Sequence, residues 1–298
     1  MPDPRFDKEL NAPSTAHSLA REYFKVQNDL LSPPIVRAAY SDRMAWILAS
    51  MAHLAYDKFE NEDALELLKV KLESGGFELV ETFNSKETDT QAFLTKNTEF
   101  AVLAFRGTEV NKLTDIRIDV RASKASVLEG RLHSGFRLAY DSVAKDIEKN
   151  VLALGKLPLY ITGHSLGAAL ATVATQRMEH NPRIRQKIAA CYTFGSPRVG
   201  NNNYDRDFKS PIYRVVNTTD IVTVVPLLTM GYIHIGDVRF LGSKDGDFRR
   251  GIPILRRMYF FFLTLLKSFS PVVGDHAIVE YRRKLEAIAQ KRNPRFGH

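Results

Sequence analysis

The feature that most constrains the fold is one tight turn between a strand pattern and a helix pattern. Leu157–Thr162 is an apolar run of strand length, and Ser165–Met178 carries apolar residues at helical spacing. The residues between and around them, 163–167, read Gly-His-Ser-Leu-Gly, a G-x-S-x-G motif. Such a turn exposes its serine at the end of a parallel sheet, and the two glycines let the strand and the helix pass without a side-chain clash. The motif therefore predicts an α/β fold with a reactive serine.

Alternating strand and helix patterns extend this prediction to a mostly parallel central sheet covered by helices on both faces. Two helices are expected before the sheet, at Ser41–Phe59 and Asn61–Leu72, each behind a capping residue. The remaining strands are expected at Phe77–Phe83, Thr90–Thr95, Phe100–Phe105, Ile188–Phe194 and Ile212–Val216, and the remaining helices at Ser134–Ala153 and Ala277–Ala289. Binding and catalysis in such sheets collect at the carboxyl ends of the strands.

The chain is expected to form a single domain over residues 1–298, because no repeat and no Gly/Ser-rich or Pro-rich linker divides it. Its 44% of hydrophobic residues suffices to bury a core. Residues 1–38 are polar and are predicted to form an arm laid over the body. The single cysteine, Cys191, cannot form an intrachain disulfide.

Residues 1–20 are charged and rich in proline where a secretory signal needs a continuous apolar segment. The most apolar run, Met258–Leu266, is about half of the ~20 residues needed to cross a bilayer. We therefore expect a cytoplasmic protein or one exported without a cleavable signal peptide, with peripheral membrane contact as an open alternative.

A serine hydroxyl is a weak nucleophile at neutral pH, so Ser165 needs a base to take its proton and an acid to orient that base. In α/β folds with this turn the chain order is nucleophile, acid, histidine. Asp220 is the best-placed acid because it follows the Ile212–Val216 strand pattern by a short loop, and Asp237 is second. The alternatives are that Ser165 merely caps the following helix and that Asp220 merely shapes a turn.

Two histidines follow Asp220 in the body of the chain. His276 is predicted to be the base because it lies in a loop, after Gly274 and Asp275, just before a helix pattern. His234 lies within Tyr232–Gly236, which resembles a strand, and a strand histidine is more often structural. No metal-ligand spacing and no phosphate-binding loop accompanies these residues, so neither a metal nor an organic cofactor is expected.

Taken in order, these residues resemble the class 3 lipases, the α/β-hydrolase family that includes the fungal triacylglycerol lipases. The resemblance covers roughly residues 100–281, and its blocks are Ala104–Thr108, His133–Phe136, Thr162–Ala169, Thr193–Asn201, Asp220–Val222, Gly231–Gly236 and Asp275–His276. It implies a catalytic triad of Ser165, Asp220 and His276. It also implies an oxyanion hole formed by the backbone N–H groups of Thr108 and Leu166, and an acyl-enzyme mechanism without a metal or organic cofactor.

The resemblance further implies an acyl-lipid substrate, either triacylglycerol or a phospholipid cleaved by phospholipase A activity. An esterase for soluble or aryl esters of the feruloyl type is the alternative, and a catalytically silent lipid-binding module is a third hypothesis. In the fungal lipases a hydrophobic lid occupies the segment that corresponds to residues 109–132. Here that segment is rich in charged residues, which predicts a polar lid region.

The net charge of +8 is concentrated at the end of the chain. Residues 249–298 hold 11 Lys or Arg against 3 Asp or Glu, which leaves 31 of the 42 bases and 31 of the 34 acids for the rest. Within this part, residues 252–273 place a narrow cationic arc beside a wide aromatic and aliphatic face when drawn as a helix. This pattern predicts a second lid or a helix contacting an anionic membrane surface, rather than nucleic acid, with a core helix as the alternative.

Overall fold

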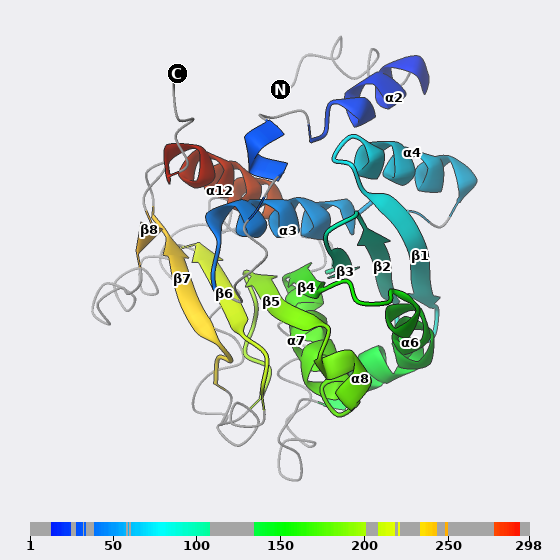
Figure 1. Ribbon diagram of the computed structural model, residues 1–298, viewed down its shortest axis with the longest axis vertical. Coiled ribbons are helices and arrows are strands. Elements are labelled where there is room, and N and C mark those ends of the chain that lie inside the picture. The colour runs from blue at the N-terminus through cyan, green and yellow to red at the C-terminus, as the bar shows by residue number, and fades with distance from the viewer. Residues whose placement is uncertain are drawn as a thin grey trace, which may run out of the picture.

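The computed structural model describes twelve stretches of the chain: residues 13–24, 28–31, 33, 39–57, 59, 61–107, 134–200, 208–217, 220, 233–242, 248–249 and 277–292. Within them the chain forms an eight-stranded sheet whose strands lie side by side in chain order (Figure 1). The strands are β1 Glu78–Ser85, β2 Thr90–Lys96, β3 Ala101–Phe105, β4 Leu159–His164, β5 Ile188–Phe194, β6 Ile212–Asn217, β7 Asp237–Leu241 and β8 Phe248–Arg249. Neighbours from β3 to β7 pair in parallel, whereas β1–β2, β2–β3 and β7–β8 pair antiparallel.

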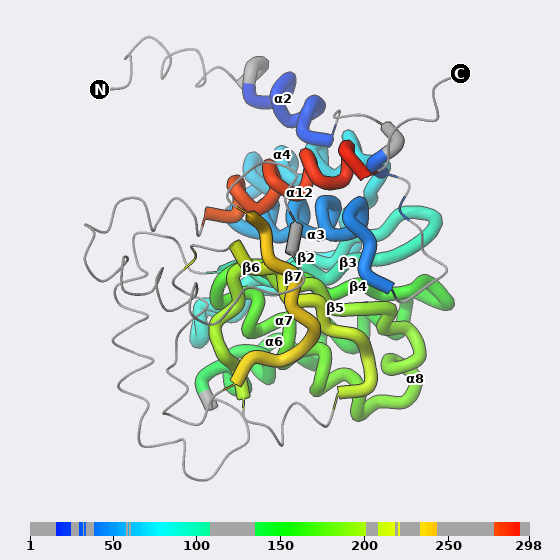
Figure 2. Tube along the Cα trace, turned by 90° about the vertical axis from the view of Figure 1, so that its left-hand side faces the viewer, coloured from blue at the N-terminus to red at the C-terminus, as the bar shows by residue number. Residues whose placement is uncertain are grey.

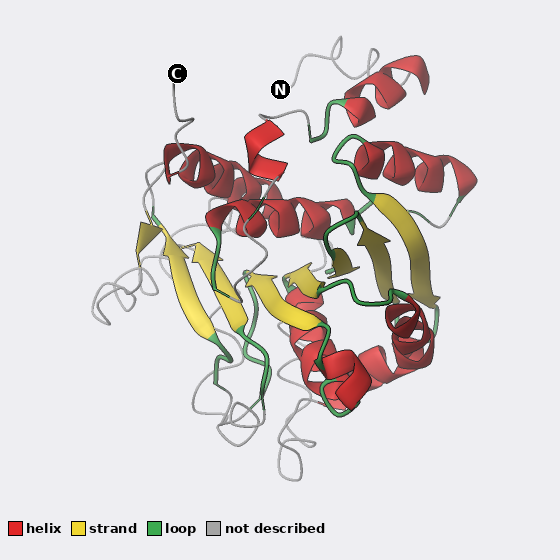
Figure 3. Cartoon of the chain, in the orientation of Figure 1, coloured by secondary structure: helices red, strands yellow, loops and turns green. Residues whose placement is uncertain are grey.

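Helices cover both faces of this sheet, as Figures 2 and 3 show. The helical elements are α2 Pro13–Arg21, the 3-10 helix η1 Asn28–Leu31, α3 Asp42–Leu54, α4 Glu62–Glu73, α6 Ser134–Ala153, α7 Leu166–Met178, α8 Pro182–Arg185 and α12 Ile278–Arg292. Crossovers between parallel strands are right-handed, so strands added in chain order place the connecting helices α6 and α7 on the same face. The opposite face is covered by α3, which precedes the sheet in the sequence, and by α12, which follows it.

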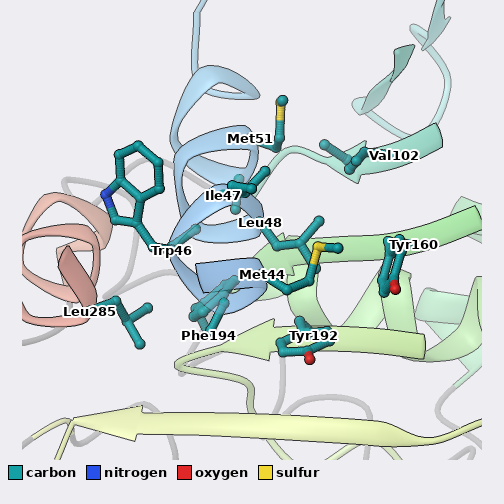
Figure 4. Packing of buried hydrophobic residues seen from close by; sticks show 14 of the residues in the cluster. Met44, Trp46, Ile47, Leu48, Met51, Val102, Tyr160, Tyr192, Phe194 and Leu285 are labelled. Carbon is teal, nitrogen blue, oxygen red and sulfur yellow. The ribbon is translucent and has the colours of Figure 1, made fainter. Parts of the chain in front are cut away.

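The two layers of side chains form two hydrophobic cores separated by the sheet. Successive residues of β3 alternate between them: Val102 and Ala104 belong to the core under α3 and α12, and Leu103 and Phe105 to the core under α6 and α7. Every residue of β3 is buried, which confirms the prediction of a strand covered on both faces. Figure 4 shows the first core, where side chains of α3 pack between Leu285 of α12 and the aromatic rings of β4 and β5.

Local sequence signals set most element boundaries. Ser41 caps α3 by accepting the N–H of Met44 at 3.3 Å, and Asn61 caps α4 by accepting the N–H of Ala64 at 2.8 Å. Helix α3 ends at Leu54, well before the predicted end at Phe59. The helix at Ser134–Ala153 and the strand at Ile188–Phe194 have the predicted boundaries.

The prediction of a strand over Tyr232–Gly236 is wrong. Among the described residues of this segment, Ile233 forms only an isolated antiparallel bridge with Gly200, and His234 belongs to no strand. The backbone turns at Gly236, whose φ of 89° is outside the extended region, and β7 begins at the next residue.

The described part of the N-terminal arm is more structured than a polar sequence suggests, since it contains α2 and η1. Phe24 and Leu30 are buried in the core beneath α3 and α4, which fixes the arm to the body. No helix in the described stretches is long and apolar enough to span a bilayer. The segments 109–132 and 252–273 lie outside the described residues, and the single-domain prediction stays a prediction.

Candidate active site

Ser165 occupies the tip of the turn between β4 and α7 in a strained backbone conformation. Its φ of 57° and ψ of −125° lie in a region that non-glycine residues rarely adopt. Two sets of hydrogen bonds hold it there. The Ser165 N–H donates to the Phe194 carbonyl of β5 at 3.0 Å, and its own carbonyl accepts the N–H of Ala168 at 3.0 Å. Strain of this kind persists only where the surrounding structure enforces it, and it is concentrated at functional sites.

The two glycines of the motif are required by close backbone contacts. A Cβ atom on Gly163 would overlap the backbone of Gly167, and a Cβ on Gly167 would overlap the carbonyl groups of Phe105 and Arg106. The second contact brings the end of β3 against the first turn of α7. The predicted passage of strand and helix at this turn is therefore present in the structure.

The Ser165 hydroxyl is buried, with 1% of the residue exposed, and has no hydrogen-bond partner among the described residues. Ser165 stands at the N-cap position of α7, but its side chain makes no capping hydrogen bond. The capping interpretation therefore does not account for the hydroxyl. A buried hydroxyl without a partner is costly, which suits a group that meets its partner in a reaction.

Leu166 begins α7, so its N–H has no carbonyl of a preceding helical turn to bond. The positive end of the helix dipole lies at the same place, beside Ser165. Arg106 and Gly107 lead from β3 past this turn. The approach is close, since a Cβ on Gly107 would overlap the carbonyl of His164. The next residue, Thr108, is outside the described stretches. The chain that leads to Thr108 thus passes directly beside the turn.

Asp220 lies just beyond the carboxyl end of β6 and is 4% exposed. Because β4, β5 and β6 are parallel, Ser165 and Asp220 follow the same edge of the sheet. The second-choice acid, Asp237, begins β7 and therefore lies at the opposite edge. Its side chain is 58% exposed and pairs with Arg239 at 2.5 Å.

The Asp220 carboxylate is linked to residues of α12 and β6 by hydrogen bonds. The Tyr281 hydroxyl donates to Asp220 Oδ2 at 2.6 Å and accepts the Asn217 N–H at 2.9 Å. Lys284 Nζ, also buried, donates to Asn217 Oδ1 at 2.8 Å. Burial, and then the Asp220 charge, raise the pKa of Tyr281 well above its usual range, so its hydroxyl stays protonated. The sequence reasoning missed these residues; the spacing of Tyr281 and Lys284 on one helix face was the available signal.

A second polar contact lies behind the nucleophile. The Tyr56 hydroxyl is 2.8 Å from His164 Nδ1, and the His164 ring meets the Tyr281 ring edge-on at 5.8 Å. Burial raises the pKa of Tyr56 as well. The predicted base, His276, lies outside the described residues, two positions before α12 begins. The described stretches hold no group of three His, Cys, Asp or Glu residues that could bind a metal ion.

Comparison with known proteins agrees with this geometry. A family model described as "Lipase (class 3)" matches residues 102–230. A lipase from Rhizopus niveus is 31% identical over 181 residues, which are 57% of this chain and 46% of the relative. A secreted mono- and diacylglycerol lipase A from Penicillium cyclopium is 29% identical over 171 residues, 54% of this chain and 55% of the relative.

Among solved structures, a triacylglycerol lipase described as having a serine protease triad at its catalytic centre superimposes with a TM-score of 0.56. It is 22% identical in sequence, and the match covers 70% of this chain and 83% of that chain. The likeness confirms the predicted α/β-hydrolase fold. The chain spans about half the length of the two curated relatives, at 46% and 55%.

Proposed function

Since a class 3 lipase family model matches residues 102–230, we propose that the chain is a serine ester hydrolase that acts on acyl lipids. The observation that carries the proposal is Ser165 itself: a strained serine with a buried, unpartnered hydroxyl among the described residues, at the first turn of α7. A hydroxyl held there faces the backbone N–H groups that stabilise a developing oxyanion.

The proposed reaction has two halves. His276 takes the Ser165 proton while Asp220 orients the imidazole, and Ser165 Oγ attacks the ester carbonyl. The N–H groups of Leu166 and Thr108 stabilise the tetrahedral oxyanion, and the alcohol leaves with the proton from His276. A water molecule activated by His276 then releases the fatty acid and restores Ser165.

Acylglycerols are the proposed substrates, in keeping with the relative from Penicillium cyclopium named a mono- and diacylglycerol lipase. Cleavage of phospholipids is a further proposal that rests on the basic end of the chain. On α12, Arg282 and Lys284 point to partners inside the protein, whereas Arg283 and Arg292 form exposed ion pairs. The partners are Ser50 and the Tyr23 carbonyl for Arg282, Asn217 for Lys284, Glu280 for Arg283 and Asp42 for Arg292. We propose peripheral membrane contact through residues 252–273 and the basic end of the chain.

The proposal is tested by comparing three substrates: a dissolved short-chain ester, a triacylglycerol emulsion and anionic phospholipid vesicles. Wild type, Ser165→Ala and the control Ser85→Ala, on edge strand β1, are assayed together. We expect Ser165→Ala to lose hydrolysis of all three substrates while Ser85→Ala keeps it. Preference for the emulsion identifies a lipase and preference for vesicles a phospholipase, whereas activity on the dissolved ester alone identifies an esterase for soluble esters. Normal turnover by Ser165→Ala contradicts the proposal.

A further inference from the structure

Asn217, the last residue of β6, connects the candidate acid to α12 through three of its groups. Its backbone N–H donates to the Tyr281 hydroxyl at 2.9 Å, and its backbone carbonyl accepts the Asp220 N–H at 3.0 Å. Its side-chain Oδ1 accepts from Lys284 Nζ at 2.8 Å. The turn that carries Asp220 is therefore held at both its backbone and its side chain.

The chemistry of these groups fixes the direction of each hydrogen bond. An ammonium group only donates, so the oxygen of the Asn217 amide must face Lys284. A backbone N–H also only donates, so the Tyr281 hydroxyl oxygen accepts the Asn217 N–H with one of its own lone pairs. Its single proton is left for the Asp220 carboxylate, which accepts it at 2.6 Å. The result is a one-way series of donors that ends on the candidate acid.

The burial of Lys284 needs a reason, because a charged group inside a protein is costly unless it is paired. Lys284 is 4% exposed, and it forms an ion pair with Glu280, 3.6 Å away on the same helix. Its shortest contact is instead the amide of Asn217. Lys284 and Tyr281 are three residues apart on α12, so both reach the end of β6 from one helix face. Figure 1 shows α12 beside α3, at the end of the sheet where β6 and β7 point.

We propose that Lys284 is a positioning residue for Asp220, acting through Asn217; this inference rests on the proposed function. Lys284 holds the Asn217 side chain, Asn217 holds the Tyr281 hydroxyl and the Asp220 backbone, and Tyr281 holds the carboxylate. A carboxylate fixed in this way keeps one lone-pair direction for the imidazole that it must orient. The charged groups that face this site from α12 and β6 are Lys284, Glu280 and Arg214, the last of which acts on Tyr281.

The first test is Lys284→Met in the full chain, assayed on a dissolved short-chain ester so that binding to a lipid surface plays no part. We expect kcat to fall about tenfold with KM within about twofold, because the change affects a group that acts in the transition state. Loss of a positive charge near Asp220 stabilises an imidazolium, so the acid limb of the kcat/KM profile moves up by roughly half a pH unit.

Lys71→Met is the matched control. Lys71 is a partly buried lysine that pairs with Asp57 at 2.9 Å, but it lies on α4 and has no hydrogen bond toward Asp220 among those described. We expect its kcat and its acid limb to match wild type. An equal loss in both lysine variants indicates a general effect on the fold and overturns the proposal.

Lys284→Met leaves the Asn217 amide without its donor, so the variant can unfold for that reason alone. The double variant Asn217→Ala/Lys284→Met removes both partners of that hydrogen bond, and it is expected to show the same loss of kcat. Combining Lys284→Met with Tyr281→Phe tests the route. If Lys284 acts through Asn217 and Tyr281, the double variant is no slower than Tyr281→Phe alone, whereas multiplied losses overturn the proposal.

Ser165→Ala separates the two proposals. If Ser165→Ala still hydrolyses the ester, the proposed function fails and the positioning role fails with it. If Ser165→Ala is inactive while Lys284→Met has wild-type kcat and an unmoved acid limb, only the positioning role fails. Inactive Ser165→Ala together with a slowed Lys284→Met and a normal Lys71→Met supports both.

Discussion

The strain at Ser165 predicts that glycine there stabilises the protein more than alanine does. The φ of 57° and ψ of −125° are the mirror image of ordinary extended backbone, which glycine adopts as readily as its normal counterpart. Ser165→Ala and Ser165→Gly both remove the buried hydroxyl, which has no partner within the part of the chain that the structure describes, so their difference isolates the backbone. Relief of about 1–3 kcal/mol of strain, less about 0.5–1 kcal/mol for the freer unfolded chain, leaves a net gain of up to about 2.5 kcal/mol for glycine.

Urea unfolding at neutral pH, followed by circular dichroism, measures this difference. The midpoint of Ser165→Gly should exceed that of Ser165→Ala with an unchanged m-value, since little surface area is altered. Both variants should be inactive, so stability and activity change in opposite directions at one residue. Such a trade-off is expected where function maintains a strained conformation.

Ser85 provides the matched control because it is a buried serine in strand β1, without a positive φ. There the order should reverse, with Ser85→Gly less stable than Ser85→Ala by about 0.5–1 kcal/mol. If Ser165→Gly is no more stable than Ser165→Ala, the backbone at Ser165 is not strained, and the reasoning from its dihedral angles is refuted.

Three further predictions concern the turn and the N-terminal arm. Gly167→Ala should lower the thermal midpoint sharply and reduce the free energy of unfolding by ~1–3 kcal/mol or more, because the added Cβ meets backbone carbonyls, which cannot rotate away. The control Gly155→Ala, whose Cβ meets no atom within 4 Å, should be less destabilising despite its φ of 66°. Burial, and then Arg282, lower the pKa of His53 to about 4. The free energy of unfolding should therefore be intact above pH 6.5 and should fall by up to ~3 kcal/mol as the pH drops from 6.5 to 4. His53→Asn should flatten this pH dependence in urea unfolding, and an unchanged slope would mean that another group causes it. Arg282→Lys should release the N-terminal arm. The variant loses the hydrogen bonds to Ser50 and the Tyr23 carbonyl, and it loses the guanidinium that lies 4.1 Å from the centre of the Tyr23 ring. Faster proteolysis within residues 13–24 would support this prediction, and wild-type resistance would contradict it.

The sequence alone determined the elements that depend on neighbours in the chain. The period-2 and period-3.6 patterns located every strand from β1 to β6 and the helices α3, α4, α6, α7 and α12. The turn at Ser165 was predictable for the same reason, because glycines at fixed offsets around a serine carry its geometry. The prediction over Tyr232–Gly236 was wrong where one glycine with positive φ outweighed an apolar run.

Only the tertiary structure decided which distant side chains meet. Asp220 and Asp237 both border strands, yet the direction of β6 and β7 places them at opposite edges of the sheet. The excess of basic residues over 249–298 predicted an anionic partner, and the fold directs two of these residues, Arg282 and Lys284, inward to partners far away in the sequence. The bonds from α12 to Asn217 and Asp220 join residues more than 60 positions apart. Such contacts depend on how strands and helices are stacked, and no local pattern of residues encodes that arrangement.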